Sequence, residues 1–225
     1  MNLLAIETAT ETVSVALSTN GAVQERYLHA PRKHAELLLP WVKELLADAD
    51  VGFAALDAIA FSRGPGSFTS LRIGIGVVQG LAWASDCPVI PVSSLAATAQ
   101  TAASEGVGAA LVALDARMNE VFTAAFVVND DGIMVSVDRE RVCDPAEVRP
   151  LNDAEFTGVG IGFERYAVLG ELSGQLADVR PHVWPRASSV LRLAQDWLLR
   201  NDALPAELAQ PVYLRDNVAK KKQDL

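Results

Sequence analysis

Short apolar runs near the start of the chain, separated by polar turns, predict three β-strands. The first run covers residues 3–6 and ends at an acid, Glu7. The second run, at 12–17, begins with alternating polar and apolar residues. A Thr-Asn-Gly turn separates it from a third run at 22–28. Because Asn-Gly favours the tight turn of a hairpin, we expect these two strands to pair antiparallel.

The period of the apolar positions then lengthens to that of a helix. Residues 34–47 carry an apolar stripe at helical spacing, and 56–61 form a short apolar run typical of a buried strand. A Gly-Pro-Gly turn at 64–66 leads into a second helix predicted over 69–85, and a further strand is predicted at 89–92. Up to residue 85 the predicted order is therefore β-β-β-α-β-α.

The second half of the chain repeats this order at a constant offset. Asp115 follows a predicted strand as Glu7 does, and it lies 108 positions after Glu7. The repeated elements are strands at 110–114, 121–128 and 133–137, a reduced helix at 145–149 and a strand at 156–161. A single α/β domain with two acidic strand ends is the alternative, but the matched offset favours an internal duplication.

Two such halves, each with an acid after its first strand, are the layout of the actin-like ATPase fold, the ASKHA or sugar kinase/Hsp70-like class. We therefore predict an α/β protein of two duplicated β-β-β-α-β-α lobes, the second one reduced. The first lobe is expected at 1–102 and the second at 103–210, with the segment 211–225 packing back on the first. Proteins of this fold usually enclose a nucleotide between their lobes.

Composition narrows the classes of function. The 225 residues carry a net charge of −9 at pH 7, which argues against a broad nucleic-acid surface because phosphate binding needs clustered Lys and Arg. The lysines at 220–222 are interpreted as a solvated tail. Two cysteines are too few for a disulfide framework, and no apolar run reaches the roughly 18 residues of a membrane span. We expect a cytoplasmic protein without a membrane contact.

Candidate phosphate-binding residues lie at the predicted strand ends. Glu7 and Asp115 are candidate acids for a cation, Thr8 offers a hydroxyl, and Gly64 and Gly66 offer backbone N–H groups to a phosphate. The Gly-Pro-Gly segment is equally a plain strand-to-helix turn, and both interpretations stay open. Neither the G-x-x-x-x-G-K-S/T loop nor a complete G-x-G-x-x-G motif is present.

The helix predicted over 69–85 is apolar on two sides, which indicates that both sides are covered. One side carries Gly76 and Gly80, although each interior Gly costs a helix roughly 1 kcal/mol relative to Ala. Small residues at four-residue spacing permit the close approach of another helix. Either an element of the same chain or a helix of another chain fills this side. In the preceding helix, His34 is expected at the surface.

Several motifs of the chain resemble one known group of proteins. The segment 5–10, Ala-Ile-Glu-Thr-Ala-Thr, and the loop 64–69, Gly-Pro-Gly-Ser-Phe-Thr, are similar to the Gcp-like group of the actin-like ATPase superfamily. The segments 63–80, 115–121 and 211–215 resemble one branch of that group, which is a paralogue of the transferase TsaD. The resemblance covers nearly the whole chain.

The resemblance implies a chain without catalytic residues of its own. TsaD carries a metal-binding His-x-x-x-His after the strand that follows the glycine-rich helix. At the matching positions this chain has Ser94 and Thr98, and a hydroxyl is a poor substitute for imidazole on iron or zinc. We therefore expect no metal and no transferase centre here, and a metalloprotease activity needs ligands that the sequence lacks.

What the resemblance implies instead is a scaffold. Such proteins pair with TsaD through the helices of the first lobe, the ATPase TsaE joins them, and the complex places a threonylcarbamoyl group on the adenosine beside the anticodon of tRNA. The tRNA is then held mainly by the partners, and the isolated chain is expected to form a homodimer. The residues placed in the partner interface on helical geometry are Leu38, Trp41, Ile73, Gly76, Val77 and Gly80.

The resemblance implies no cofactor of the chain's own. ATP or ADP is expected at most at the interface of the complex, with weak or no binding to the isolated chain. The alternative function is a nucleotide-dependent phosphotransferase or ATPase of the same fold. Glu7, Asp115 and the glycine loop favour that alternative, and the lack of a recognisable adenosine pocket or catalytic base disfavours it.

Overall fold

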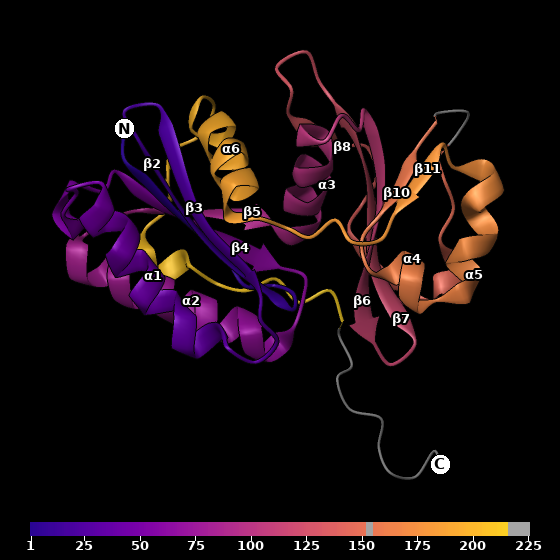
Figure 1. Ribbon diagram of the computed structural model, residues 1–225, viewed down its shortest axis with the longest axis horizontal. Coiled ribbons are helices and arrows are strands. Elements are labelled where there is room, and N and C mark those ends of the chain that lie inside the picture. The colour runs from indigo at the N-terminus through magenta and orange to yellow at the C-terminus, as the bar shows by residue number, and fades with distance from the viewer. Residues whose placement is uncertain (152–154, 216–225) are drawn as a thin grey trace, which may run out of the picture.

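The computed structural model describes residues 1–151 and 155–215, so the expected lysine tail at 220–222 lies outside the described residues. Two mixed β-sheets with helices on both faces make up the described chain (Figure 1). The elements of the first half are β1 (Leu3–Glu7), β2 (Thr12–Thr19), β3 (Ala22–His29), α1 (His34–Asp48), η1 (Phe53–Ala55), β4 (Ala58–Gly64), α2 (Phe68–Ser85), β5 (Val89–Ser93) and α3 (Ser94–Ser104). The elements of the second half are β6 (Ala109–Arg117), β7 (Glu120–Val128), β8 (Met134–Ser136), β9 (Arg141–Cys143), η2 (Pro145–Glu147), β10 (Thr157–Val159), α4 (Gly162–Arg165), α5 (Ala167–Gly170), η3 (Glu171–Gln175), β11 (Asp178–Arg180), α6 (Ala187–Leu198) and η4 (Ala206–Leu208).

Both sheets have the same topology. The first has the strand order β3-β2-β1-β4-β5, in which β2 pairs antiparallel with both neighbours and β4 and β5 run parallel to β1. The second has the order β11-β10-β6-β7-β8, in which β10 and β11 run parallel to β6, and β9 also pairs with β7. Thus β6 corresponds to β1, and the internal duplication predicted from the offset of Glu7 and Asp115 is confirmed.

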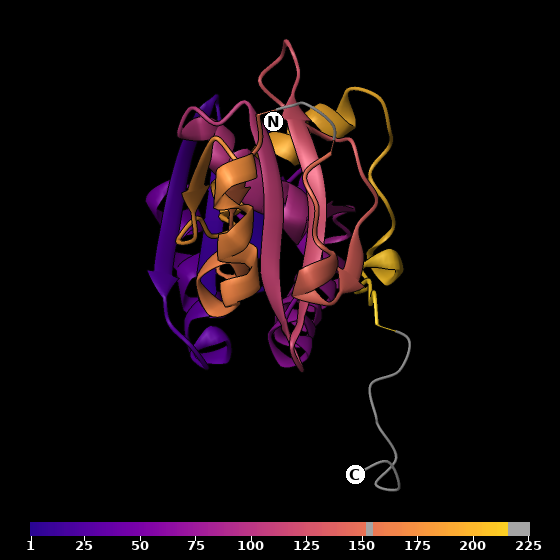
Figure 2. The same ribbon diagram turned by 90° about the vertical axis from the view of Figure 1, so that its right-hand side faces the viewer.

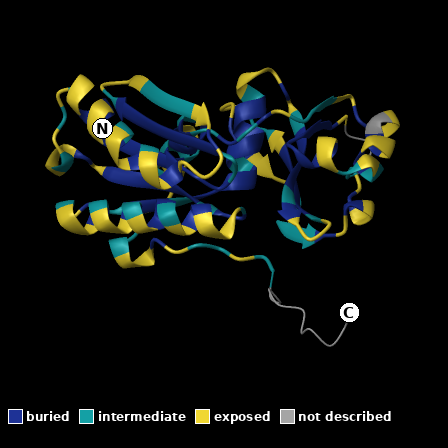
Figure 3. Ribbon diagram, turned by 60° about the horizontal axis from the view of Figure 1, so that its bottom comes forward, coloured by how far each residue is buried: buried dark blue, intermediate teal, exposed yellow. Residues whose placement is uncertain are grey.

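The sheets and helices lie in layers. Helices α1 and α2 cover the outer face of the first sheet, α6 and α3 lie between the sheets, and α4 and α5 cover the outer face of the second (Figure 1). Figure 2, seen from the side of the second sheet, shows α4 and α5 in front of its strands. The strands are largely buried, whereas the outer helices carry exposed stretches (Figure 3). Within the described residues, none of the helices combines the length and apolar character that a bilayer span requires.

Helices α3 and α6 are exchanged between the two halves. Helix α3 follows the first sheet in the sequence, but it packs chiefly against β6, β7 and β8. Helix α6, near the end of the described chain, packs against β1 and β2, and its Val190 and Leu191 share a buried core with Leu3 of β1. A boundary at residue 102 therefore separates α6 from the sheet that it covers, and the division into 1–102 and 103–210 stays a prediction.

The turn between β4 and α2 fixes where α2 begins. The strand predicted at 56–61 begins and ends later, because residues 53–55 form a short 3-10 turn. Gly64 ends β4 with a φ of +98°, a conformation that glycine adopts without strain. The side chain of Ser67 then caps the helix by accepting a hydrogen bond from the Ser70 N–H (3.5 Å). Helix α2 therefore begins at Phe68, directly after its cap, and the Ser67 N–H donates to the carbonyl of Ala9 in the turn after β1.

Candidate functional site

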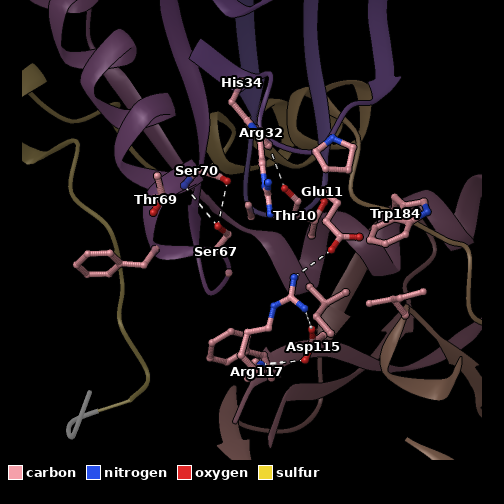
Figure 4. Close-up of a pocket in the computed structure, with 18 of the residues that line it drawn as sticks. Thr10, Glu11, Arg32, His34, Ser67, Thr69, Ser70, Asp115, Arg117 and Trp184 are labelled. Carbon is pink, nitrogen blue, oxygen red and sulfur yellow. Dashed lines mark hydrogen bonds and ion pairs between the residues drawn. The ribbon is translucent and has the colours of Figure 1, made fainter. Parts of the chain in front are cut away.

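A cavity of about 710 Å³ lies between the two halves of the molecule. The β1–β2 turn (9–11) and the segment 66–70 line it on the side of the first half. Residues 114–118 line it on the side of the second half, and Figure 4 shows Glu11 facing Asp115 and Arg117 across the space. The sequence analysis expects a nucleotide between the lobes, and this cavity is therefore the place to compare with that expectation.

Glu7, the first candidate acid, does not line this cavity. Its side chain is completely buried, and its Oε1 accepts a hydrogen bond from the Ala9 N–H. Its Oε2 has no hydrogen-bond partner among the described residues. Burial raises the pKa of Glu7 to about 7, although hydrogen bonds from Ala9, Ser62 and Thr8 act in the opposite direction. The carboxyl group of Glu7 therefore cannot contact a cation in the cavity.

The glycine loop packs directly against the β1–β2 turn. The Ser67 N–H donates a hydrogen bond to the carbonyl of Ala9 (2.8 Å). A Cβ on Gly66 would overlap that same carbonyl, so only glycine permits this close approach. The Ser67 N–H is consequently engaged within the chain, which favours the interpretation of the Gly-Pro-Gly segment as a structural turn.

Thr8 is also engaged within the first half. Its N–H donates to the hydroxyl of Ser62 (3.3 Å), and its own hydroxyl fills the space where a Cβ on Gly74 would lie. Helix α2 therefore packs on the β1–β2 turn through a glycine. The predicted residues that the structure brings together in this packed region are Glu7, Thr8, Gly64 and Gly66.

Asp115, the second candidate acid, lies on the other side of the cavity and is already paired. Its side chain is only 7% exposed, and it forms ion pairs with Arg117 (3.1 Å) and with Arg165. Its Oδ1 accepts hydrogen bonds from the Tyr166 hydroxyl (2.7 Å) and the Arg117 N–H (2.9 Å). Burial acts to raise the pKa of Asp115, but these hydrogen bonds and the arginine charges outweigh it and lower the pKa. Asp115 is thus held in its charged form by protein groups.

Sequence reasoning missed three members of this cluster, Glu11, Arg165 and Tyr166. Glu11 lies in the β1–β2 turn and pairs with Arg165 (2.8 Å) and Arg117 (3.0 Å). Burial acts to raise the pKa of Glu11, and the two arginines outweigh it and lower the pKa. Because Glu11 and Arg165 are 154 positions apart and belong to no recognised motif, no local pattern indicated that they meet.

These residues do not fit a nucleotide-bound cation. A phosphate-bound Mg²⁺ needs carboxylate oxygens that are free to bind it. Glu7 lies outside the cavity lining, and Glu11 and Asp115 are occupied by guanidinium groups. The geometry therefore disfavours a phosphotransferase, and weak or absent nucleotide binding to the isolated chain stays a prediction.

Ser94 and Thr98, at the positions of the transferase histidines, are both buried. The Ser94 hydroxyl donates to the carbonyl of Pro65, and the Thr98 hydroxyl donates to the carbonyl of Ser94 (2.8 Å). These two hydroxyls therefore stabilise the start of α3 and its contact with the glycine loop. In the part of the chain that the structure describes, no three His, Cys, Asp or Glu side chains gather as metal ligands. The expectation that the chain holds no metal stays a prediction.

The side of α2 that carries the predicted partner surface is open at its glycines. Gly76 and Gly80 are exposed, and a Cβ added to either would meet no atom of the described residues within 4 Å. Trp83 of the same helix is 74% exposed, and sequence reasoning did not select it. Three other predicted contact residues are half-buried: Trp41, Ile73 and Val77. Among the described residues, no element of the chain covers Gly76 and Gly80.

Two residues of α1 lie elsewhere than predicted. Leu38 is 0% exposed and packs with Val42 and Leu45 in the core beneath α1, so its selection as a partner contact is wrong. The reason is that the apolar stripe of α1 faces the first sheet, and Leu38 belongs to that stripe. His34 is buried rather than exposed, and its Nε2 lies 3.0 Å from the carbonyl of Thr10. Burial lowers the pKa of His34.

Comparison with known proteins agrees with this architecture. The family model described as TsaD, tRNA N6-adenosine threonylcarbamoyltransferase, matches residues 28–223. Together with the duplicated topology, this match defines a Gcp-like protein of the actin-like ATPase fold. The solved structure of YeaZ from Pseudomonas aeruginosa is 40% identical, with a TM-score of 0.85 over 95% of this chain and 99% of that one.

Two further relatives narrow the family. The tRNA threonylcarbamoyladenosine biosynthesis protein TsaB of Escherichia coli (strain K12) is 38% identical over 99% of this chain and 98% of its own length. TsaB of Haemophilus influenzae is also 38% identical, over 99% of this chain and 97% of its own length. The chain belongs to the TsaB family.

Proposed function

We propose that the chain is a non-catalytic subunit in the biosynthesis of threonylcarbamoyladenosine in tRNA. The names of its relatives support the pathway, and the cavity residues disfavour a nucleotide-dependent reaction within the chain. In this proposal a TsaD protein supplies the transferase centre, TsaE joins the pair, and the tRNA is held mainly by these partners. The complex works in the cytoplasm, and ATP or ADP binds at its interface rather than to this chain alone.

The observation that carries the proposal is the open glycine side of α2. Gly76 and Gly80 lie one helical turn apart, and no atom of residues 1–151 or 155–215 stands within 4 Å of a Cβ built on either. A helix backbone from another chain can therefore approach α2 more closely here than side chains would allow. Ile73 and Val77 are only half-buried beside the glycines, so a partner helix would remove their apolar surface from water. The same surface would join two copies of the chain when the partner is absent.

Substitution of one glycine tests the proposed interface. Gly76→Leu should leave the isolated chain folded because the new side chain meets open space, and it should abolish co-purification with a cognate TsaD because it blocks helix approach. The matched control is Gly170→Leu, which places the same side chain at an exposed helical glycine of α5 on the second sheet. Circular dichroism checks the fold, and size-exclusion chromatography of the mixture should show a one-to-one complex for the wild type and the control. Normal complex formation by Gly76→Leu would refute this interface.

A further inference from the structure

Two guanidinium groups of the interlobe cavity lie between a carboxylate of the first half and a carboxylate of the second. Arg165 lies between Glu11 of the first half and Asp115 of the second, and Arg117 contacts the same two carboxylates. We infer that these two guanidinium groups substitute for a phosphate-bound cation and join the two halves of the chain without any ligand. The inference concerns the isolated chain, and it stands or falls separately from the proposed partnership.

Arg165 contacts one carboxylate from each half of the molecule. It is the last residue of α4, its NH2 group lies 2.8 Å from Glu11 Oε1, and its NH1 group donates to Asp115 Oδ2. A guanidinium carries five N–H donors in one plane, so it can bind two carboxylates at once. Because Glu11 belongs to the first half and Asp115 to the second, this side chain connects the halves across the cavity.

Arg117 contacts the same two carboxylates as Arg165 and adds a second positive charge to the cluster. Its NH2 group lies 3.0 Å from Glu11 Oε1, and its NH1 group lies 3.1 Å from Asp115 Oδ2. Two carboxylates thus face two guanidinium groups, and their formal charges cancel. A neutral cluster offers no net attraction to a metal ion.

Tyr166 orients Asp115 for this role. Its hydroxyl donates to Asp115 Oδ1 (2.7 Å), which leaves Oδ2 directed to both arginines. The cluster is reinforced nearby, where Arg215 donates to the carbonyl of Ala116 (3.1 Å). The side chains of Glu11 and Arg165 are 29% and 30% exposed, so water and salt screen the bridge partly, and its opening should be sensitive to ionic strength.

Hydrogen exchange measured by mass spectrometry tests this bridge on the isolated chain. In Arg165→Met, the segments 8–12 and 114–120 should exchange about two- to fivefold faster than in the wild type, because a local opening that separates the halves costs less free energy. Glu11→Gln, which keeps the shape of the side chain, should act in the same direction. The matched control is Arg180→Met, which removes a pair with Asp178 (2.9 Å) within the second half and should leave both segments unchanged.

Two further measurements complete the test. Arg165→Lys keeps the charge but not the planar fork, so its exchange should lie between those of the wild type and Arg165→Met. Millimolar Mg·ATP should leave wild-type exchange unchanged in both segments. The inference is overturned if Arg165→Met and Glu11→Gln both exchange like the wild type, or if Mg·ATP slows exchange of the wild type in these segments. Thermal melting of each variant confirms that it is folded before exchange is compared.

Discussion

At the scale of the residue, Glu7 is a carboxyl group that is held where its charge is poorly solvated. Its side chain is completely buried, and its Oε2 lacks a partner among the described residues. Burial raises its pKa from 4.5 to about 7. When folding raises the pKa of an acid, its contribution to the free energy of unfolding is complete below the pKa of the unfolded state. That contribution is lost as the pH rises through the pKa of the folded state.

Glu7→Gln should therefore change the pH dependence of stability. The free energy of unfolding of the wild type should fall relative to the variant between about pH 4.5 and pH 7, by up to about 3 kcal/mol, because the wild type must hold a buried charge above that range. Urea denaturation of both proteins at several pH values measures the difference. Glu11 and Asp115, whose pKa values are lowered, are present in both proteins and cancel in the comparison. Parallel curves for the two proteins would contradict this account of Glu7.

The sequence identified individual residues only where a local pattern indicated them. Glu7 and Asp115 stand at equivalent strand ends, so the repeat located both. Glu11 and Arg165 meet only in the folded chain, and no motif or spacing connects them. Leu38 was misassigned because helical periodicity gives the direction of a side chain relative to its own helix, and not which neighbour that direction faces.

At the scale of the element, the last described residues of the chain form hydrogen bonds with α2. The Arg72 guanidinium lies 3.7 Å above the ring of Phe68, and its Nε donates to the Tyr213 hydroxyl (3.1 Å). Further along the helix, Gln79 donates to the carbonyl of Ala209 (2.8 Å). The segment around 209–213 therefore runs along α2. The motif at 211–215 and the glycine-rich helix thus lie side by side in the folded chain.

Arg72→Ala should loosen this segment without unfolding the molecule. It removes a cation–π contact and a hydrogen bond at an exposed site, so the free energy of unfolding should fall by about 1 kcal/mol. Trypsin should also cleave the region after residue 199 faster. The control is Arg200→Ala, which breaks an exposed pair with Asp196 (2.9 Å) and should change stability by less than about 0.5 kcal/mol. Equal effects of the two variants would show that Arg72 does not hold the segment.

Elements were predictable where the period of apolar positions was unbroken. Helix α2 and strand β2 lie within two residues of their predicted bounds, since long periodic runs define them well. Strand β4 was displaced because Leu56 is buried in a turn and so extended the apolar run. The short α4 and α5 carry no complete helical stripe, so the sequence did not predict them.

At the scale of the whole molecule, the two halves are not independent units. The inner face of the first sheet is covered by α6, whose Val190, Leu191 and Ala194 lie in one core with Leu3 and Ala5. The repeat predicted two similar halves, and the topology confirmed them. The exchange of α3 and α6 was not predictable, because a helix pattern does not say which sheet the helix will cover.

A charge placed in α6 should therefore destabilise the first sheet. Val190→Asp buries an unpaired carboxylate in a position that is 0% exposed, and the free energy of unfolding should fall by more than about 3 kcal/mol. Nuclear magnetic resonance should show the loss of protection in β1 and β2, although the substitution lies more than 170 positions away from them in sequence. The control is Leu199→Asp, at a position that is 80% exposed, with an expected change within about 0.5 kcal/mol. Loss of protection confined to the second half would contradict the exchanged packing.

The position of α6 also bears on how the chain folds during synthesis. A nascent chain emerges from the ribosome in order, so β1 and β2 are available long before residues 187–198. Until then α6 is not available to cover their inner face, and the part that it would cover offers an apolar surface to chaperones or to other nascent chains. The first sheet therefore cannot be fully covered before α6 has been made, and a premature stop before residue 187 would release a product that lacks this helix.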